Sequence, residues 1–292
     1  MKRIGDSELI LNPDGSIYHL NLLPEDISDV IILVGDQDRV DVISSFFDTI
    51  EVKKQKREFR THTGYYKGRR ITALSTGIGT DNIDIVVNEL DAIVNIDLKN
   101  RVPKEEHTTL NLIRIGTSGS LQADIPVDTP VAAKISLGFD SLLNFYAGRD
   151  KISNKDMEEK FMKFVNWNPI LHRPYFVNGS EELFNKIAFD MRYGITIAAP
   201  GFYGPQGRRL RLDPIDPDMN EKLSEFEYNG LKITNFEMES SAIYGLSALL
   251  GHNALAICNI IANRKRMEFS KDYKAGVKET IKTVLDRIVE NM

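Results

Sequence analysis

Short apolar runs that end in a glycine or polar loop, alternating with longer amphipathic segments, most constrain what this sequence can fold into. The runs have the length of buried strands and lie at residues 29–34, 70–75, 110–115 and 254–262. Segments of helical spacing follow the first strand over 40–47 and the second over 83–96, and others lie at 242–250 and 273–289. This alternation predicts an α/β fold built around a sheet.

The predicted strands end in loops that are rich in glycine and polar residues. These loops are Gly35-Asp36, the segments 76–79 and 116–119, and Asn263-Arg264. Ligands of open α/β sheets bind beyond the carboxyl ends of the strands. We therefore expect the loops to converge on one site.

The length and composition favour a single domain over residues 1–292. With 292 residues, 42% of them hydrophobic, the chain can bury a sizeable core. Residues 95–107 are rich in Asp, Lys and Glu and predict a solvated loop. Residues 140–178 are polar and aromatic, with a charged helical stretch at 151–163. No Gly/Ser linker brackets this second insertion, which favours an excursion or lid over a separate small domain.

Composition and spacing disfavour several classes of protein. A net charge of −5 argues against a dedicated nucleic-acid binder, and the apolar stretches fall short of the roughly 20 residues of a membrane helix. The single cysteine, Cys258, rules out an internal disulfide and a multi-cysteine metal site. The histidines form no His-x-x-x-His pair, so a zinc hydrolase is not indicated. We expect a cytoplasmic protein that binds neither membranes nor nucleic acid.

Three arginines lie beside the glycine-rich strand ends. Arg39 falls on the first turn of the helix after the first strand, where backbone N–H groups and a guanidinium make a site for anions. Arg114 lies in the strand that leads to Gly116-Thr117, and Arg57 precedes Glu58 on an edge-like segment. Each is also typical of a surface arginine, so the pattern leaves both interpretations open.

Two carboxylates precede the apolar helix at 242–250. Glu237 and Glu239 flank Met238. Acidic residues are common at a helix N-terminus, where they favour the helix dipole. A carboxylate with two free oxygens also binds paired sugar hydroxyls. The pattern alone favours the first interpretation.

A turn-forming stretch at 202–208 combines an aromatic ring, an amide and a guanidinium. These belong to Phe202, Gln206 and Arg208. Such a stretch is either an ordinary surface loop or a set that stacks on a heterocycle and hydrogen-bonds its edge.

Six blocks of the sequence together carry a family resemblance. They lie at 34–39, 57–59, 75–79, 114–119, 235–240 and 260–264. The residue types in these blocks and the order of the blocks resemble those of the nucleoside phosphorylases, most closely the uridine phosphorylases. In the first block, Val34 and Gln37 stand where prolines are usual in the family. The resemblance implies an α/β fold of one domain, with a central mixed, partly barrel-like sheet flanked by helices.

The roles implied by the resemblance fall into three groups. Phosphate-binding positions are matched by Gly35, Arg39, Arg114 and Thr117, with Arg57 contributed across a dimer interface. Ribose-binding positions are matched by Met238 and Glu239, with His19 reaching the neighbour's ribose. Base-binding positions are matched by Phe202, Gln206, Arg208 and Ile261, of which the Gln–Arg pair is typical of pyrimidine enzymes.

Arg264 supports pyrimidine specificity. Purine enzymes of this family usually carry an aspartate there, and an arginine cannot serve as that acid at neutral pH. The resemblance thus implies reversible phosphorolysis of uridine to uracil and ribose 1-phosphate, with catalytic roles for Arg39, Arg114, Gln206, Arg208 and Arg264. The alternatives are a purine nucleoside phosphorylase, a nucleosidase of the same fold and a non-catalytic nucleoside-binding protein.

The resemblance also implies a homo-oligomer, either a dimer or a hexamer of three dimers, and no metal or organic cofactor. Some relatives hold a monovalent cation at the dimer interface with a glutamate that matches Glu58. In this chain Thr80-Asp81-Asn82 replaces a Gly-Pro-Ser stretch of that site. The resemblance therefore does not carry a potassium site over to this sequence.

Replacing Arg57 tests the role that the resemblance gives it. Arg57→Ala should raise the KM for phosphate far more than the KM for the nucleoside, because the guanidinium is expected to contact only the anion. Steady-state kinetics with each substrate varied in turn measures both constants. Equal losses in the two would contradict the assignment.

Overall fold

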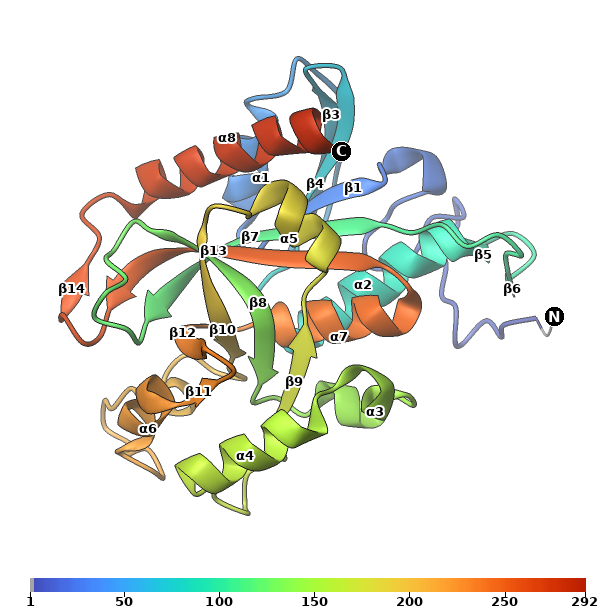
Figure 1. Ribbon diagram of the computed structural model, residues 1–292. Helices are drawn as coiled ribbons and strands as arrows, with labels where there is room; N and C mark the ends of the chain where they lie inside the picture. The colour runs from blue at the N-terminus through green and yellow to red at the C-terminus, as the bar shows by residue number, and fades with distance from the viewer. Residues whose placement is uncertain (1–2) are drawn as a thin grey trace.

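A 12-stranded mixed sheet forms the centre of the protein, which a computed structural model describes over residues 3–292 (Figure 1). Its strands are β1 (Val30–Val34), β2 (Thr49–Lys56), β3 (Phe59–Tyr66), β4 (Arg69–Ser75), β7 (Asn111–Ser120), β8 (Pro130–Gly138), β9 (Tyr175–Asn178), β10 (Arg192–Ala198), β11 (Glu227–Tyr228), β12 (Leu231–Glu237), β13 (Asn253–Asn263) and β14 (Glu268–Phe269). Their order is β11-β12-β10-β8-β13-β7-β1-β4-β3-β2, with β9 beside β8 and β14 beside β13. β5 (Ile96–Asp97) and β6 (Val102–Pro103) pair separately.

Part of this sheet closes into a barrel. β7, β13, β8, β10 and β12 are neighbours in that order, and β12 pairs in turn with β7, placing Asn235 opposite Ser120 and Phe236 opposite Gly119. The closing pair is antiparallel, whereas most of the barrel pairs are parallel. The structure therefore confirms the predicted α/β fold with a mixed, partly barrel-like sheet.

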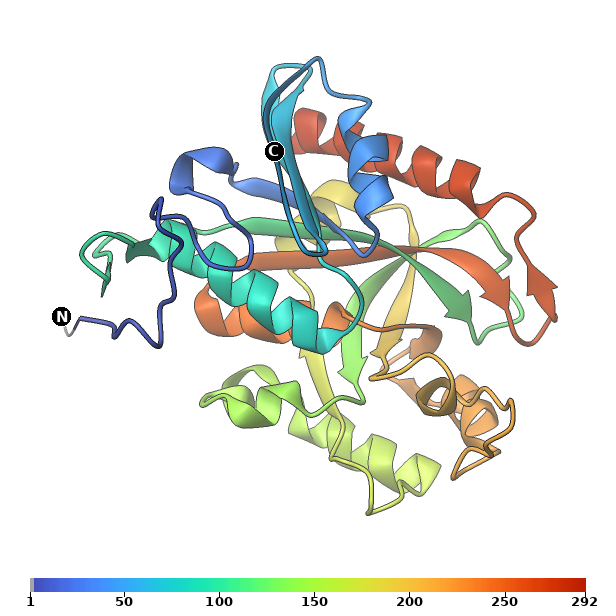
Figure 2. The same ribbon diagram turned by 180° about the vertical axis from the view of Figure 1, so that it is seen from behind.

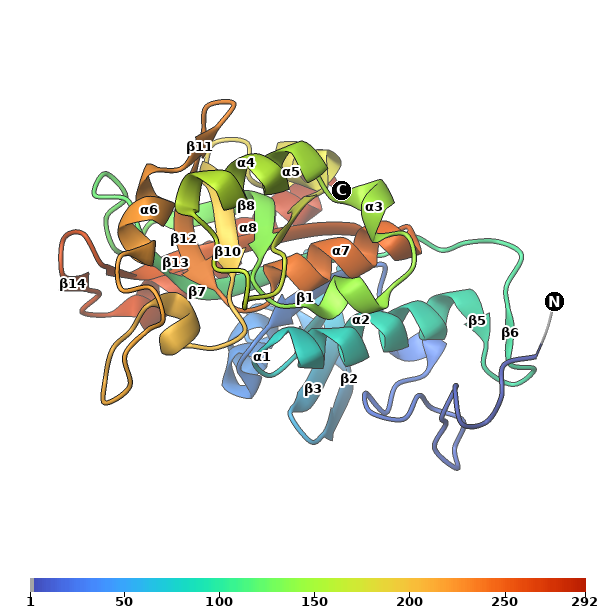
Figure 3. The ribbon, with the colours of Figure 1, turned by 90° about the horizontal axis from the view of Figure 1, so that it is seen from below.

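Helices cover both faces of the sheet (Figure 2). They are α1 (Gln37–Ser44), α2 (Thr80–Asn95), α3 (Arg149–Ile152), α4 (Lys155–Val165), α5 (Glu181–Ile187), α6 (Met219–Glu225), α7 (Ser240–Leu250) and α8 (Tyr273–Asn291). α1, α5 and α8 pack on one face, and α2 and α7 lie side by side on the other (Figure 3). α4 and α6 pack outside the barrel. Over residues 3–292, no helix has the length and apolar character needed to cross a lipid bilayer.

The side chains of β1 show how the sheet separates two cores. Val30, Ile32 and Val34 pack with the core of α1 and α8. Ile31 and Leu33 belong to the core of α2 and α7. Successive side chains of a strand point to opposite faces, so a strand covered on both sides must be apolar throughout. This requirement explains the uninterrupted apolar run over Val30–Val34; the strand predicted from residue 29 begins one residue later, because Asp29 is exposed.

The predicted strands and helices are present, with two corrections. The strand predicted at 110–115 does not end at Gly116. β7 continues to Ser120, because residues 116–120 pair with β13 and their last two also pair with β12. The segment at 95–107, predicted as a solvated loop, contains the β5–β6 pair. Both differences arise from pairing between strands, which composition does not reveal.

The insertion at 140–178 packs against the outside of the barrel. It contains the 3₁₀ turn η2 (Leu142–Phe145), α3, α4 and β9. β9 pairs antiparallel with β8, with Tyr175 opposite Gly138. Phe161 of α4 packs edge-on against Phe176 of β9, with 5.5 Å between the ring centroids. The insertion is therefore attached to the central sheet by both backbone pairing and aromatic packing.

Gly138 lies where β8 faces the ring of Tyr175. A Cβ atom at position 138 would lie 2.4 Å from Cζ of that buried ring, whose hydroxyl donates to Asp140 at 2.8 Å. Gly138→Ala should therefore lower the free energy of unfolding by about 1–3 kcal/mol, the usual effect of overpacking a core. Chemical denaturation measures the change. Gly5→Ala, at an exposed position whose nearest neighbour would be 4.0 Å away, is the matched control, and equal losses in both variants would contradict the prediction.

Candidate active site

A cleft of about 820 Å³ opens at the ends of β1, β4, β7, β12 and β13. Most of the residues singled out from the sequence line it together: Gly35, Arg39, Glu58, Arg114, Thr117, Phe202, Gln206, Arg208, Met238, Glu239 and Ile261. Three of the four predicted segments, 35–36, 76–79 and 116–119, contribute to this lining, although 116–119 is strand rather than loop; Asn263-Arg264 does not line the cleft. Arg264 lies directly behind this lining, in hydrogen-bond contact with Gln206.

One part of the cleft is built for an anion. The Asp36 carboxylate accepts the backbone N–H of Asp38 at 3.0 Å and begins α1, which places Arg39 on the first turn. Nη1 of Arg39 donates to the carbonyl of Ile115 at 3.3 Å. Burial and the nearby Arg114 lower the pKa of Arg39, but a guanidinium stays charged at neutral pH. Two neighbouring guanidinium groups in one cleft favour a bound anion.

Arg114 is buried between two carboxylates. Its Nη2 forms an ion pair with Oε2 of Glu239, and its Nε lies 3.5 Å from Oε2 of Glu237. Burial alone would lower the pKa of Arg114, but the two carboxylates raise it above its ordinary value. Nη1 has no hydrogen-bond partner although it is buried. Arg114 therefore has a buried N–H group whose hydrogen bond the protein itself does not satisfy.

The sequence left open whether Glu237 and Glu239 stabilise a helix N-terminus or bind a ligand. The carboxylate of Glu237 accepts the N–H groups of Glu239 and Ser240, each at 2.9 Å, and so caps the start of α7. Glu239 lines the cleft and accepts the N–H of Gly79 at 2.7 Å. The helix-terminus interpretation is right for Glu237, although both carboxylates line the cleft.

A second part of the cleft gathers an aromatic ring, an amide and guanidinium groups. The guanidinium of Arg208 lies 3.7 Å from the centroid of the Phe202 ring. Arg208 donates to Oε1 of Gln206, and Nη2 of Arg264 lies 3.4 Å from the same oxygen. Burial and the like charge of Arg208 lower the pKa of Arg264 to about 10, so it is still a cation at pH 7. Since both arginines are donors, they fix Oε1 toward themselves and leave the amide NH₂ as the free end.

His19 and Arg57 do not line this cleft in the single chain. Nδ1 of His19 lies 2.6 Å from Oε1 of Glu89, and Oε2 of the same carboxylate accepts the backbone N–H of Leu20 at 2.9 Å. Arg57 is exposed at the turn between β2 and β3, with a φ of 54°. Its carbonyl accepts the side-chain amide of Gln37 at 2.8 Å, which ties this turn to the start of α1.

Several lining residues were not predicted from the sequence. Asn82 and Phe269 lie outside the predicted site segments, whereas Ile78 and Phe236 lie inside the segments 76–79 and 235–240 but were given no role. Asn82 is within three residues of a predicted site segment, and that proximity is a signal that was available. Phe269 lies on β14, an added edge strand that no sequence pattern indicated.

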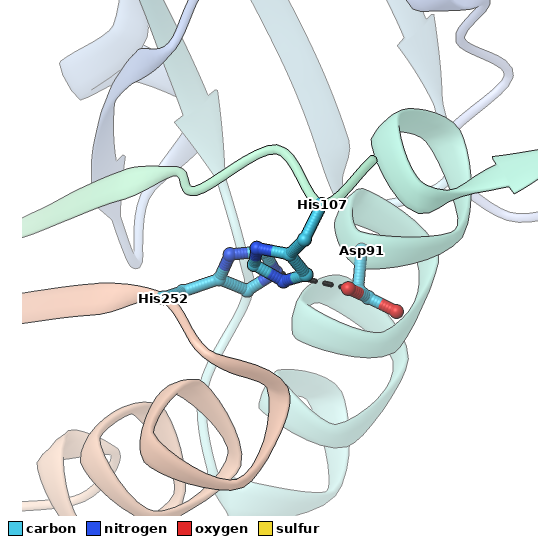
Figure 4. Close-up of side chains that lie close together, drawn as sticks. All are labelled: Asp91, His107 and His252. Atoms are coloured by element: carbon cyan, nitrogen blue, oxygen red, sulfur yellow. Dashed lines mark hydrogen bonds and ion pairs between the residues drawn. The ribbon is translucent and has the colours of Figure 1, made fainter. Parts of the chain in front are cut away.

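Asp91, His107 and His252 form a second cluster, away from the cleft (Figure 4). Nδ1 of His252 accepts the N–H of Leu110 at 3.1 Å, so its proton is on Nε2, which lies 3.1 Å from Asp91. His107 is 2.9 Å from the carbonyl of Leu250 through Nε2. A metal ion on Nε2 of His252 would move the proton to Nδ1, against the Leu110 N–H. The geometry therefore favours a hydrogen-bonded link between α2, α7 and β7 over a metal site.

The fold and the cleft define the class to which the protein belongs. Residues 29–290 match the phosphorylase superfamily, and the chain is a member of that family. It is 31% identical over 274 residues to a uridine phosphorylase of Thermococcus kodakarensis, covering 91% of this chain and 83% of the relative. It is 29% identical to a DeoD-type purine nucleoside phosphorylase of Listeria welshimeri, covering 83% of this chain and 85% of the relative.

A solved structure supports the same family. A nucleoside phosphorylase of Trypanosoma brucei that shows uridine phosphorylase activity matches with a TM-score of 0.87 and 31% identity, over 97% of this chain and 99% of that one. A uridine phosphorylase of Phytophthora capsici, at 21% identity and a TM-score of 0.68, shares the fold over 97% of this chain and 99% of that one.

Removing His252 tests the structural interpretation of the histidine cluster. His252→Ala should lower the free energy of unfolding by about 1–3 kcal/mol, because the buried N–H of Leu110 loses its acceptor. Zn²⁺ should not raise the Tm of the unmodified protein. His107→Ala, at an exposed side chain, is the control and should cost less than about 0.5 kcal/mol. A Zn²⁺-dependent rise in Tm that either variant abolishes would instead indicate a metal site.

Proposed function

We propose that the protein catalyses the reversible phosphorolysis of uridine to uracil and α-D-ribose 1-phosphate. One observation carries this proposal: a single cleft joins the Arg39–Arg114 pair to the Phe202–Gln206–Arg208 set. An anion and a heterocycle therefore find complementary groups within reach of one another. The T. kodakarensis uridine phosphorylase and the T. brucei nucleoside phosphorylase support the same substrate.

Phosphate is the nucleophile in the proposed mechanism. Arg39 and Arg114 hold it in line with C1′ of the ribose, with Thr117 and the loop at Gly35 beside it. A phosphate oxygen forms the new bond to C1′ as the electron pair of the glycosidic bond leaves with the uracil. Holding the reactants in this geometry removes much of the entropic barrier. The phosphate charge also stabilises the cationic ribose, so these steps require neither a metal nor an organic cofactor.

The nucleoside is held by the remaining groups. Glu239 accepts hydrogen bonds from the ribose hydroxyls beside Met238, and Phe202 and Ile261 contact the base. The NH₂ of Gln206 and the guanidinium of Arg208 stabilise the negative charge that develops on the departing uracil.

Pyrimidine rather than purine specificity follows from Arg264. It hydrogen-bonds Gln206, and with a pKa of about 10 it holds its proton at pH 7 and cannot supply one to a purine ring. An arginine pair that holds phosphate likewise gives no advantage to a nucleosidase, for which water is the nucleophile.

We also propose that the active unit is a homodimer, either alone or within a hexamer. The support is that His19 and Arg57 match functional positions of the family but do not line the cleft of their own chain. Arg57 is exposed at a hairpin turn, where a neighbouring subunit has access to it.

Uridine turnover with and without phosphate tests the proposed function. We expect cleavage of uridine that depends strictly on phosphate and no cleavage of inosine, followed as the loss of ultraviolet absorbance in alkali. Cleavage without phosphate would indicate a nucleosidase, and cleavage of inosine alone would show that Gln206 and Arg208 are misassigned. No cleavage of either would indicate a nucleoside-binding protein.

A further inference from the structure

Glu237 is a buried carboxylate to which the proposed mechanism gives no part. Its side chain is 1% exposed at the end of β12. Oε2 accepts the N–H of Glu239 at 2.9 Å and lies 3.5 Å from Nε of Arg114. Oε1 accepts the N–H of Ser240 at 2.9 Å and the hydroxyl of Ser240 at 2.5 Å. The ionised carboxylate is therefore fully hydrogen-bonded within the protein.

The cleft already holds carboxylates close to its arginines: Glu237 and Glu239 contact Arg114, and Asp36 and Glu58 line the same cleft. Arg39 and Arg114 offset the carboxylates of Glu237 and Glu239. A phosphate dianion bound by the two arginines leaves an excess of negative charge in a largely buried site, which is costly. A proton on one carboxylate removes part of this excess.

The other groups that face Glu237 do not supply a compensating charge. Tyr244 of α7 and Cys258 of β13 lie close enough for the charge of Glu237 to act on them. Burial, with Glu237 adding to it, raises the pKa of both groups, to about 12 for Cys258, so both are neutral at physiological pH. Arg114 is thus the cation that contacts this carboxylate, and it is shared with Glu239.

A chain of buried hydroxyl groups is placed to accept a hydrogen bond from protonated Glu237. Oγ of Ser240 lies 2.7 Å from Oγ of Ser136, which lies 3.5 Å from the carbonyl oxygen of Thr196. When Glu237 is ionised, Ser240 donates to it and Ser136 donates to Ser240. When Glu237 carries a proton, the directions reverse and the chain ends at the Thr196 carbonyl. Every hydroxyl keeps an acceptor in both states.

We propose that Glu237 takes up one proton from solvent when phosphate binds in the cleft, and that the Ser240–Ser136 hydroxyl pair reverses its hydrogen bonds to receive it. This inference rests on the proposed function, since phosphate is the ligand. The bond that forms is the O–H bond of the carboxyl group. Neutral Glu237 no longer draws on the charge of Arg114, which then acts more fully on phosphate.

The acidity of Glu237 suits this role. Burial and the neighbouring Glu239 raise the pKa of Glu237 to about 7. In the free protein at about pH 8.5 the carboxyl is mostly ionised, and a nearby dianion raises the pKa further. Proton uptake on phosphate binding should therefore be largest at about this pH, where phosphate itself is already a dianion in solution.

Calorimetric titration with inorganic phosphate tests the proposal without a nucleoside. At about pH 8.5, the binding enthalpy of the unmodified protein should differ between two buffers of unlike ionisation enthalpy, corresponding to uptake of up to about one proton. Glu237→Gln should bind phosphate with the same enthalpy in both buffers, because the amide is neutral throughout. Because phosphate is already a dianion at this pH, the protons that the buffers report are those taken up by the protein.

Ser241→Ala is the matched control. Its hydroxyl lies on the same turn of α7 but donates to Asp140 at 2.7 Å, so this variant should keep the full proton uptake. Equal proton uptake by Glu237→Gln and the unmodified protein would overturn the proposal. A binding enthalpy of the unmodified protein that does not depend on the buffer would also overturn it, and this second result does not require the variant to fold. Absence of phosphate binding by the unmodified protein would overturn the proposed function as well.

Discussion

Arg114 has a side chain that is 6% exposed and lies between Glu237 and Glu239, so the removal of Arg114 would leave two buried carboxylates without their cation. Breaking such a group typically costs about 3–5 kcal/mol. The arrangement exists because β12 closes the barrel against β7, which brings the carboxylates at the end of one strand to the arginine of the other. The strand pairing that closes the barrel therefore also brings the charged residues of the cleft together.

The remaining parts of the cleft are fixed to this centre through the backbone. Glu239 accepts the N–H of Gly79, which joins the β4–α2 loop to the start of α7. α2 and α7 then lie side by side and meet the histidine cluster at their far ends (Figures 3 and 4). On the other side of the cleft, Gln37 binds the carbonyl of Arg57 and connects α1 to the β2–β3 turn. The cleft is held by rigid elements rather than by free loops.

The sequence predicted the elements and the types of residue in the cleft better than it predicted their connections. The run at 30–34 is recognisable because burial on both faces of β1 leaves no polar position. Residues 116–120 are rich in glycine and serine and favour a loop locally, and only their partners β12 and β13 make them a strand. The different roles of Glu237 and Glu239 likewise depend on Arg114, which is distant in sequence. The features that could not be predicted are those that depend on contacts between residues far apart in the sequence.

The fixed orientation of the Gln206 side-chain amide determines which hydrogen-bonding groups of a ligand it can recognise. A free glutamine side chain can turn over and offer either its oxygen or its nitrogen, and so accepts ligands of either polarity. Here Arg208 and Arg264 both approach Oε1 of Gln206, which is only 3% exposed. These contacts fix the orientation of the amide before any ligand binds. A base that turns a carbonyl toward the NH₂ gains a hydrogen bond, whereas a base with an amino group there brings donor against donor. The fixed amide therefore favours a base edge that presents a carbonyl group.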